Sequence, residues 1–153
     1  MAIIQARLGA TRLPGKVLKT LGGKSVLAQV IARVRTCPQL DGVVVATTDQ
    51  PADTAVADEA RKCGAAIFRG SADDVLSRYH GAAQRETADV IVRVTADCPL
   101  YDGSLLDRML VLFKQWNAAG TMVDYVNNTL EPTFPRGLDT EIFHLRRIGP
   151  RAS

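Results

Sequence analysis

Aromatic residues and cysteines are both scarce in this chain. Phe, Trp and Tyr make up 5% of its 153 residues, and none is interleaved with basic residues as a base-stacking platform requires. We therefore expect no nucleic-acid partner. Cys37, Cys63 and Cys98 are odd in number, widely spaced and without a C-x-x-C pair. This pattern argues against a disulfide framework or a zinc site and predicts free thiols in a reducing cytoplasm.

Long hydrophobic runs are also missing. No stretch approaches the length of a membrane span, and the N-terminus passes from Ile3-Ile4 into a charged loop without the layout of a signal peptide. We expect no membrane association. With 46% apolar and 23% charged residues, the composition is that of a globular protein with one sizeable core. We predict a single domain over residues 1–153.

Acidic residues are absent from the first 40 positions. That segment carries seven Lys and Arg residues, whereas the rest of the chain carries 12 basic and 16 acidic ones. A positive segment that faces a carboxylate-rich remainder suits a small anionic ligand with a divalent metal between the two. It suits a nucleic-acid groove less well.

Three cations lie on one loop near the N-terminus. The apolar run at residues 2–5 leads into a loop that is punctuated by Gly and Pro and contains Arg7, Arg12 and Lys16. Such a loop can surround a polyanion, because glycine lets backbone N–H groups approach phosphate oxygens.

The spacing of this loop is not that of a Walker A loop, because five residues separate its glycines Gly9 and Gly15, and Val follows the lysine. A dinucleotide-binding G-x-G-x-x-G is missing as well. The residues alone leave open a phosphate-binding loop or a solvated basic turn.

Strand-like runs alternate with helical periodicity along the chain. Continuous Val/Ile runs favour parallel strands that are covered on both faces, and the alternation predicts a three-layer α/β/α fold with a mostly parallel sheet. In such a fold, ligands bind at the carboxyl ends of the strands. Residues 127–137 are expected to form a loop. The predicted strands are 2–5, 43–47, 66–68 and 90–95, and the predicted helices begin after Ser25, near Asp53, with the capping segment 71–74, whose Asp74 would stand at the third helical position, and near Ser104.

Carboxylates follow the last strands. Asp97 comes directly after the strand at 90–95 and before a Cys-Pro pair, which suits a magnesium ligand at the sheet edge, although a turn-forming Asp is an equal alternative. Asp139 and Glu141 are two residues apart and share a face if the segment is extended. Magnesium takes one or two carboxylates together with phosphate oxygens and water, so Asp97 and one of this pair would suffice.

Six ordered motifs resemble one family over nearly the whole chain. They are IIQARLGATRLPGKVL, VVVATTD, FRGSADDVLSRY, VRVTADCPL, VDYVNN and PRGLDTEIF. Together they resemble the spore-coat polysaccharide biosynthesis protein F type of cytidylyltransferase, a relative of the acylneuraminate and 3-deoxy-manno-octulosonate cytidylyltransferases with the nucleotide-diphospho-sugar transferase fold. The resemblance implies transfer of a nucleotide from a nucleoside triphosphate, CTP in this family, to a sugar or sugar acid, with release of pyrophosphate and with Mg²⁺ as cofactor.

The resemblance also implies roles for individual residues. Arg12, Lys16 and Asp97 match catalytic positions, with Asp97 and Asp139 as metal ligands and Glu141 as a sugar contact. The nucleotide-binding positions that it implies are Arg7, Gly9, Thr11, Thr48, Asp49, Arg69 and Ser71.

The chain departs from the family pattern at two points. Ala10 stands where relatives carry serine, and Thr11 is the nearest hydroxyl that could substitute. Relatives continue past the equivalent of Ser153, so we expect this chain to lack their C-terminal part, with acceptor-site and dimer-contact elements; a homodimer is possible.

Two alternative functions stay open. One is a metal-dependent glycosyltransferase of similar fold, which normally carries an Asp-x-Asp, and the other is a truncated, non-catalytic nucleotide-binding module.

Overall fold

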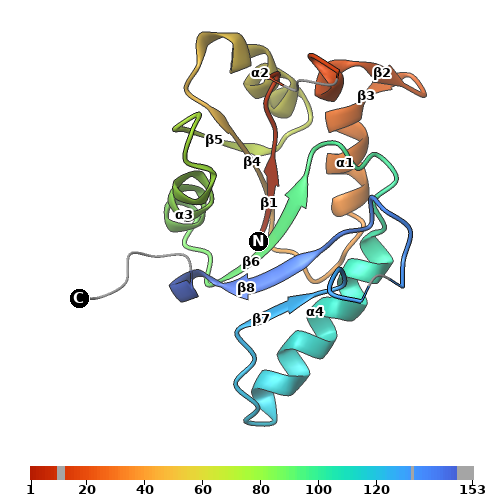
Figure 1. Ribbon diagram of the computed structural model, residues 1–153, viewed down its shortest axis with the longest axis vertical. Coiled ribbons are helices and arrows are strands. Elements are labelled where there is room, and N and C mark those ends of the chain that lie inside the picture. Colours follow the sequence, from red (N-terminus) through yellow and green to blue (C-terminus); the bar gives the residue numbers. More distant parts are fainter. Residues whose placement is uncertain (10–12, 132, 148–153) are drawn as a thin grey trace.

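A six-stranded sheet forms the centre of the protein (Figure 1). The computed structural model describes residues 1–9, 13–131 and 133–147. The strand order is β5-β4-β1-β6-β8-β7, with β1, β4, β5 and β6 parallel and β7 and β8 antiparallel to their neighbours. The mostly parallel sheet is therefore confirmed. The strands are β1 (Ala2–Gln5), β4 (Val43–Thr48), β5 (Ala66–Gly70), β6 (Val90–Thr95), β7 (Tyr125–Asn127) and β8 (Glu141–His144), and β2 (Thr20–Leu21) and β3 (Lys24–Ser25) form a separate hairpin.

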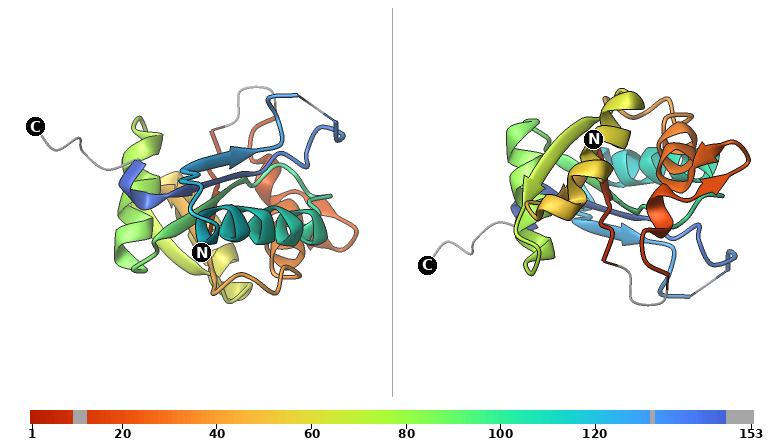
Figure 2. Two further views of the ribbon diagram at one scale, coloured as in Figure 1. Left: turned by 90° about the horizontal axis from the view of Figure 1, so that it is seen from below. Right: turned by 90° about the horizontal axis from the view of Figure 1, so that it is seen from above.

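Helices cover the two faces of the sheet unequally. Within residues 1–9, 13–131 and 133–147, the apolar sides of three helices pack on one face, and α3 alone packs on the other (Figure 2). The predicted three layers are confirmed, and in the described structure α3 lies over β5, β4 and β1 and reaches β6 through Tyr79, whereas it makes few contacts with β8 and β7. The helices are α1 (Val26–Val34), α2 (Thr54–Lys62), α3 (Val75–Arg85) and α4 (Gly103–Ala118), with short 3-10 turns at Lys16–Leu18, Pro51–Asp53 and Leu145–Arg147.

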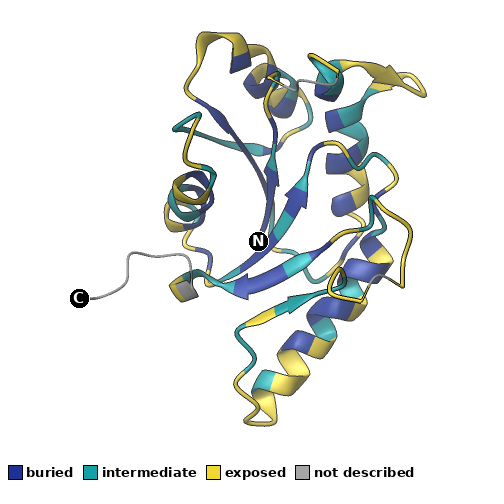
Figure 3. Ribbon diagram, in the orientation of Figure 1, coloured by how far each residue is buried: buried dark blue, intermediate teal, exposed yellow. Residues whose placement is uncertain are grey.

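The buried residues follow the expected alternation. All six residues of β4 are buried, because this strand lies inside the sheet and is covered on both faces. Successive side chains of β1 enter opposite clusters: Ile4 packs under α1 and α4, and Ile3 packs under α3. In Figure 3 the buried positions form a continuous stretch through the central strands, while the outer side of α4 is exposed. None of the helices among the described residues is both long and apolar enough to cross a bilayer.

Helix starts are set by local hydrogen bonds. Ser25 caps α1 as predicted, since its hydroxyl accepts a hydrogen bond from the Ala28 N–H at 3.0 Å. For α3 the cap is Asp74, whose carboxylate accepts from Ser77 N–H at 2.9 Å. Ser71 lies outside this helix, and its hydroxyl accepts from the backbone of residues 73 and 74. The helix therefore begins later than the capping segment indicated.

The antiparallel strands β7 and β8 are absent from the sequence prediction. Both are short, and β7 forms the sheet edge, so neither shows a long apolar run. The register pairs Arg93 of β6 with Glu141 of β8. Because β8 runs against β6, the residues that precede Glu141 lie at the carboxyl end of β6, beside the candidate site.

Candidate active site

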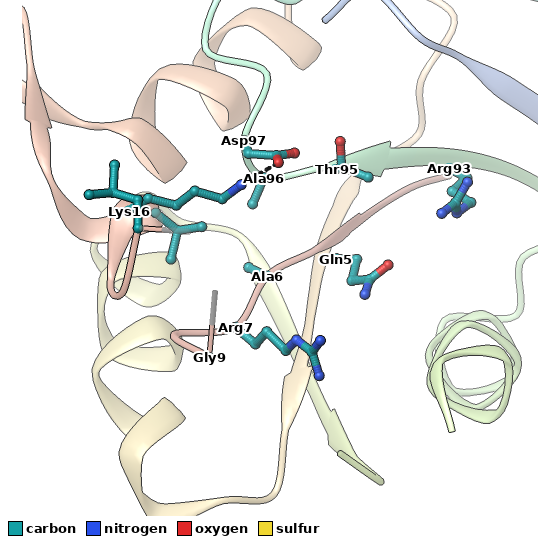
Figure 4. Close-up of a pocket in the computed structure, with 11 residues that line it drawn as sticks. Gln5, Ala6, Arg7, Gly9, Lys16, Arg93, Thr95, Ala96 and Asp97 are labelled. Carbon is teal, nitrogen blue, oxygen red and sulfur yellow. Dashed lines mark hydrogen bonds and ion pairs between the residues drawn. The ribbon is translucent and has the colours of Figure 1, made fainter. Parts of the chain in front are cut away.

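The first loop and the end of β6 meet at the carboxyl edge of the sheet (Figure 4). Lys16 Nζ donates a hydrogen bond to Asp97 Oδ2 at 2.5 Å, although 81 residues separate the two along the chain. Lys16 begins the 3-10 turn that follows the loop, and Asp97 follows the buried strand β6 by two residues. The basic segment and a distant carboxylate therefore face one cleft, as the charge distribution predicted.

This cleft has a volume of about 700 Å³. It is lined from β1 by Gln5 and from the following loop by Arg7 and Gly9, and the opposite wall contains Arg93, Thr95 and Asp97 of the β6 segment. In Figure 4 Lys16 lies at one end of the cleft and Arg93 at the other. Its size lies within the range of small-ligand sites, and the cations on its walls suit a ligand with several negative charges.

Lys16 keeps Asp97 ionised. Partial burial opposes ionisation, but the hydrogen bonds from Lys16 and Thr95 and the charge of Lys16 outweigh it, so the pKa of Asp97 lies below its ordinary value of 3.8. Because the pKa of Asp97 is lower in the folded than in the unfolded protein, its ionised carboxylate stabilises the fold at pH values above the unfolded-state pKa. This contribution is lost as the pH falls through the folded-state pKa.

We expect this pair to add a constant increment to stability at neutral pH. The free energy of unfolding of the native chain relative to Asp97→Asn should be independent of pH between about 5 and 8, because Asp97 is ionised in both states there. The difference should shrink at pH values below the ordinary pKa. Urea titrations across this range measure it, and a difference that grows on acidification would contradict the assignment.

Asp97 and the predicted ligand Asp139 are the carboxylates that a hard divalent cation would contact at this edge of the sheet. Asp97 is half-exposed to the cleft, and continuing the β6–β8 register by two residues places Asp139 opposite Thr95 at the same edge. Burial is the main cause that raises the pKa of the Cys98 thiol, and the charges of Asp97, 3.9 Å away at its Oδ1, and of Asp139 add to it. Within the described ranges no three His, Cys, Asp or Glu side chains converge on one point. The donor set therefore suits a hard cation that shares its coordination with phosphate oxygens.

The segment that carries Asp139 is held firmly. The Asn128 side chain donates to the Leu138 carbonyl at 2.9 Å and accepts from the Thr140 N–H at 2.8 Å. The buried Thr140 hydroxyl is hydrogen-bonded to the Tyr101 hydroxyl at 2.8 Å. These bonds fix the backbone on both sides of Asp139. Its assignment as a metal ligand stays a prediction.

A buried carboxylate anchors the first loop. Asp53, only 4% exposed, accepts a hydrogen bond from the Leu8 N–H at 2.7 Å and another from the Thr48 hydroxyl. It thereby ties the start of the loop to the end of β4 and to the start of α2. The sequence indicated only a helix start at this position, and no local pattern reveals a hydrogen-bond partner 45 residues away.

Removing this anchor should destabilise the protein. In Asp53→Ala the Leu8 N–H loses its partner in a partly buried position, so we expect a loss of about 1–3 kcal/mol in the free energy of unfolding. Urea denaturation measures the change. The matched control Asp58→Ala removes an exposed carboxylate of α2 and should alter stability by less than about 0.5 kcal/mol. Equal effects of the two substitutions would refute the anchoring role.

The four predicted nucleoside contacts lie together at the ends of β4 and β5, and three of them already have protein partners. The Arg69 guanidinium donates to the carbonyls of Thr48 and Gln50 at 3.0 and 2.9 Å. The Thr48 hydroxyl is buried against Asp53, and the Ser71 hydroxyl caps its own turn. Asp49 is the exposed residue among the four. Arg69 therefore braces the β4–α2 connection, and the nucleotide-binding roles stay predictions.

Arg78 is an unexpected buried cation behind this region. It is 1% exposed and donates to the carbonyls of Ser71 and Ala72, while its Nε has no hydrogen-bond partner in the described structure. Burial, and then the charge of Arg7, lowers the pKa of Arg78. Arg78 thus fixes the loop that contains Ser71.

Arg93 is a further cleft residue that the sequence analysis did not select. Its guanidinium is ion-paired with Glu141, the predicted sugar contact, and lies 5.8 Å from the centroid of the Tyr79 ring. Burial opposes its charge, but Tyr79 and Glu141 outweigh that effect and raise the pKa of Arg93. A signal was available, since it is the one charged residue within the apolar run 90–95. The predicted Thr11 and Arg12 lie outside the described residues.

The cytidylyltransferase family profile matches residues 1–140. This chain belongs to that family. The spore coat polysaccharide biosynthesis protein SpsF of Bacillus subtilis is 41% identical over 112 residues, which are 71% of this chain and 47% of SpsF. Membership in the cytidylyltransferase family agrees with the resemblance that the six motifs indicated.

Solved structures of cytidylyltransferases share the fold. One from Leptospira borgpetersenii serovar Hardjo-bovis is 39% identical and superposes with a TM-score of 0.90 over 96% of this chain and 60% of its own. A CMP:2-keto-3-deoxy-manno-octonic acid synthetase complexed with CTP has a TM-score of 0.73 at 18% identity, over 96% of this chain and 74% of its own. The chain spans about half the length of SpsF and three fifths of the Leptospira protein.

Proposed function

We propose that this chain binds CTP and transfers its cytidylyl group to a sugar hydroxyl, for the biosynthesis of a surface polysaccharide or another glycoconjugate. The observation that carries the proposal is the meeting of Lys16 and Asp97 in a cleft that Arg7 also lines. Membership in the cytidylyltransferase family supports CTP as the donor. The relative SpsF, named for polysaccharide biosynthesis, supports the wider role.

In this reaction the acceptor hydroxyl attacks the α-phosphorus of CTP, the bond to the β-phosphate oxygen breaks, and pyrophosphate leaves. The protein contributes mainly orientation and charge stabilisation. Arg7 and Lys16, with the predicted Arg12, hold the phosphates and neutralise the charge that develops on the departing pyrophosphate. Asp53 keeps the loop in place for this task through the Leu8 N–H.

Asp97 and Asp139 are the residues that would hold Mg²⁺. When bound, the ion supplies positive charge to the phosphate oxygens and lowers the pKa of the acceptor hydroxyl. The ammonium group of Lys16 compensates the charge of Asp97. Its flexible side chain can turn to the phosphates when a cation takes over the carboxylate.

Thermal unfolding with the four common ribonucleoside triphosphates tests the donor. We expect CTP with Mg²⁺ to raise the unfolding temperature most, because a ligand that binds only the folded state stabilises it. A coupled pyrophosphate assay with added sugar acids tests the transfer. Stabilisation by CTP without pyrophosphate would identify a nucleotide-binding module, and no preference among the triphosphates would refute the donor assignment.

A further inference from the structure

The strand pairing that holds β6 beside β8 ends before it reaches either of the two proposed metal ligands. In the described part of the chain this ladder ends at the pair Arg93–Glu141. Asp97 follows β6 by two residues, and Asp139 precedes β8 by two residues. Main-chain hydrogen bonds between the two strands therefore do not fix the separation of these carboxylates, and other contacts must set it.

A buried hydrogen bond between two side chains joins the segments that carry these carboxylates. Tyr101 lies on the connection after Asp97, Thr140 directly follows Asp139, and each is 1% exposed. The oxygens of their hydroxyl groups are 2.8 Å apart. The Tyr101 N–H also donates to the Cys98 carbonyl at 3.0 Å. The phenol is therefore fixed to the turn that directly follows Asp97.

The direction of this hydrogen bond follows from the second contact of Thr140. The Thr140 hydroxyl donates to the Leu138 carbonyl at 3.2 Å, so its oxygen accepts from the phenol, and Tyr101 is the donor. Burial raises the pKa of the Tyr101 phenol, which therefore keeps its proton at neutral pH. Both hydroxyl groups thus have partners, which is the condition under which a buried polar network makes a structure rigid.

Asn128 holds the same segment from the side of β7, which it directly follows. Its side-chain amide bridges the Leu138 carbonyl and the Thr140 N–H, the backbone groups on either side of Asp139. The backbone of Asp139 is thereby tied to β7 and, through the Thr140 hydroxyl, to the turn after Asp97. We use the term bridging network for the three side chains Tyr101, Thr140 and Asn128.

We propose that the bridging network holds the Asp97 and Asp139 carboxylates at the separation that one divalent cation requires, so that its three members are positioning residues. The inference rests on the proposed function. Two carboxylates that share no cation repel each other, and a flexible pair loses conformational entropy when it closes around an ion. A network that is already formed reduces both costs and so raises the affinity for the cation.

Binding of Mn²⁺ without nucleotide tests the proposal apart from catalysis. Mn²⁺ takes the same oxygen ligands as Mg²⁺, and its electron paramagnetic resonance signal reports the free ion. Asp97→Asn and Asp139→Asn should each weaken binding by at least about tenfold, which locates the ion. Tyr101→Phe removes only the donor hydroxyl and should raise the dissociation constant by about tenfold, as loss of an outer-shell partner does. No binding by the native chain, or an unchanged constant in any of these variants, would overturn the proposal.

Asn117 provides a matched control for Asn128. Its amide donates to the carbonyls of Phe113 and Val123 at 2.9 and 3.0 Å and accepts from the Val123 N–H at 3.2 Å, so it joins α4 to the segment before β7. Both asparagines are half-buried. Asn117→Ala and Asn128→Ala should therefore lower the unfolding temperature by similar amounts, but only Asn128→Ala should weaken Mn²⁺ binding. Equal Mn²⁺ constants in the two variants would mean that Asn128 is only structural.

Substitutions of Thr140 separate the hydrogen bond from packing. Thr140→Ser keeps the hydroxyl and should bind Mn²⁺ within about threefold of the native chain, whereas Thr140→Val should bind as weakly as Tyr101→Phe. These last two substitutions remove the same hydrogen bond, so the double variant should bind no more weakly than the weaker single variant. Effects that multiply in the double variant, or equal binding by the serine and valine variants, would overturn the proposal.

Failure of this inference is distinguishable from failure of the proposed function. If CTP with Mg²⁺ stabilises the native chain most, but variants of the bridging network bind Mn²⁺ as the native chain does, only the positioning role is refuted. If CTP stabilises the native chain no more than the other triphosphates do, the proposed function is refuted, while the Mn²⁺ constants still decide the positioning role.

Discussion

Asp97→Asn should reduce cytidylyl transfer by a factor on the order of 10³. The substitution keeps the shape of the side chain but removes the negative charge that faces the cleft, so the site loses its proposed cation ligand together with the partner of Lys16. Stability should change little, because the ion pair is partly exposed and pairs of this kind contribute about 0–1 kcal/mol. Pyrophosphate release under saturating CTP and acceptor measures the loss.

Asp58→Asn is the matched control for this substitution. Asp58 is an exposed carboxylate of α2 that pairs with Arg61 on the surface. Its replacement should leave turnover unchanged. A loss of turnover in Asp97→Asn that tracks its unfolding temperature would mean that Asp97 is only structural, and full turnover would refute its role outright.

Lys16→Ala should reduce transfer by a factor on the order of 10². Lys16 reaches the cleft from the loop and is the cation that we place on the departing pyrophosphate, so its loss removes charge stabilisation that is strongest in the transition state. The decrease should therefore appear mainly in kcat, with a smaller increase in the KM for CTP. Steady-state kinetics with varied CTP separates the two constants.

Removing Lys16 should also change how Asp97 responds to Mg²⁺. Without its ammonium partner the Asp97 carboxylate loses its counter-charge, so Mg²⁺ alone should stabilise Lys16→Ala more than it stabilises the native chain. Lys62→Ala changes an exposed lysine of α2 and serves as the control. Unchanged kcat in Lys16→Ala would contradict its placement on the leaving group.

The parallel half of the fold could be predicted from the sequence, and the antiparallel edge could not. The strands β1, β4 and β6 consist of apolar runs because both of their faces are covered, and such runs are visible without a structure. The strands β7 and β8 are short, and the four residues of β8 are polar at both ends and apolar in the middle, without a strict alternation. A pattern of that length does not distinguish a strand from a loop.

The candidate site shows a similar division. Lys16 and Asp97 were predictable because each follows a strand and the carboxyl ends of parallel strands meet at one edge. Asp53 and Arg78 were not, because their roles depend on hydrogen bonds to the backbone of distant or neighbouring loops. Arg93 was missed because a single charged residue in a strand has no partner until the β6–β8 register is known.

The Asp53 carboxylate has a thermodynamic consequence for ligand capture. A Gly-rich loop that is free in solution loses conformational entropy when it closes around a ligand, which weakens association. Here the backbone at Leu8 is immobilised before any nucleotide arrives. We therefore expect calorimetry of CTP binding to show a less unfavourable entropy change for the native chain than for Asp53→Ala.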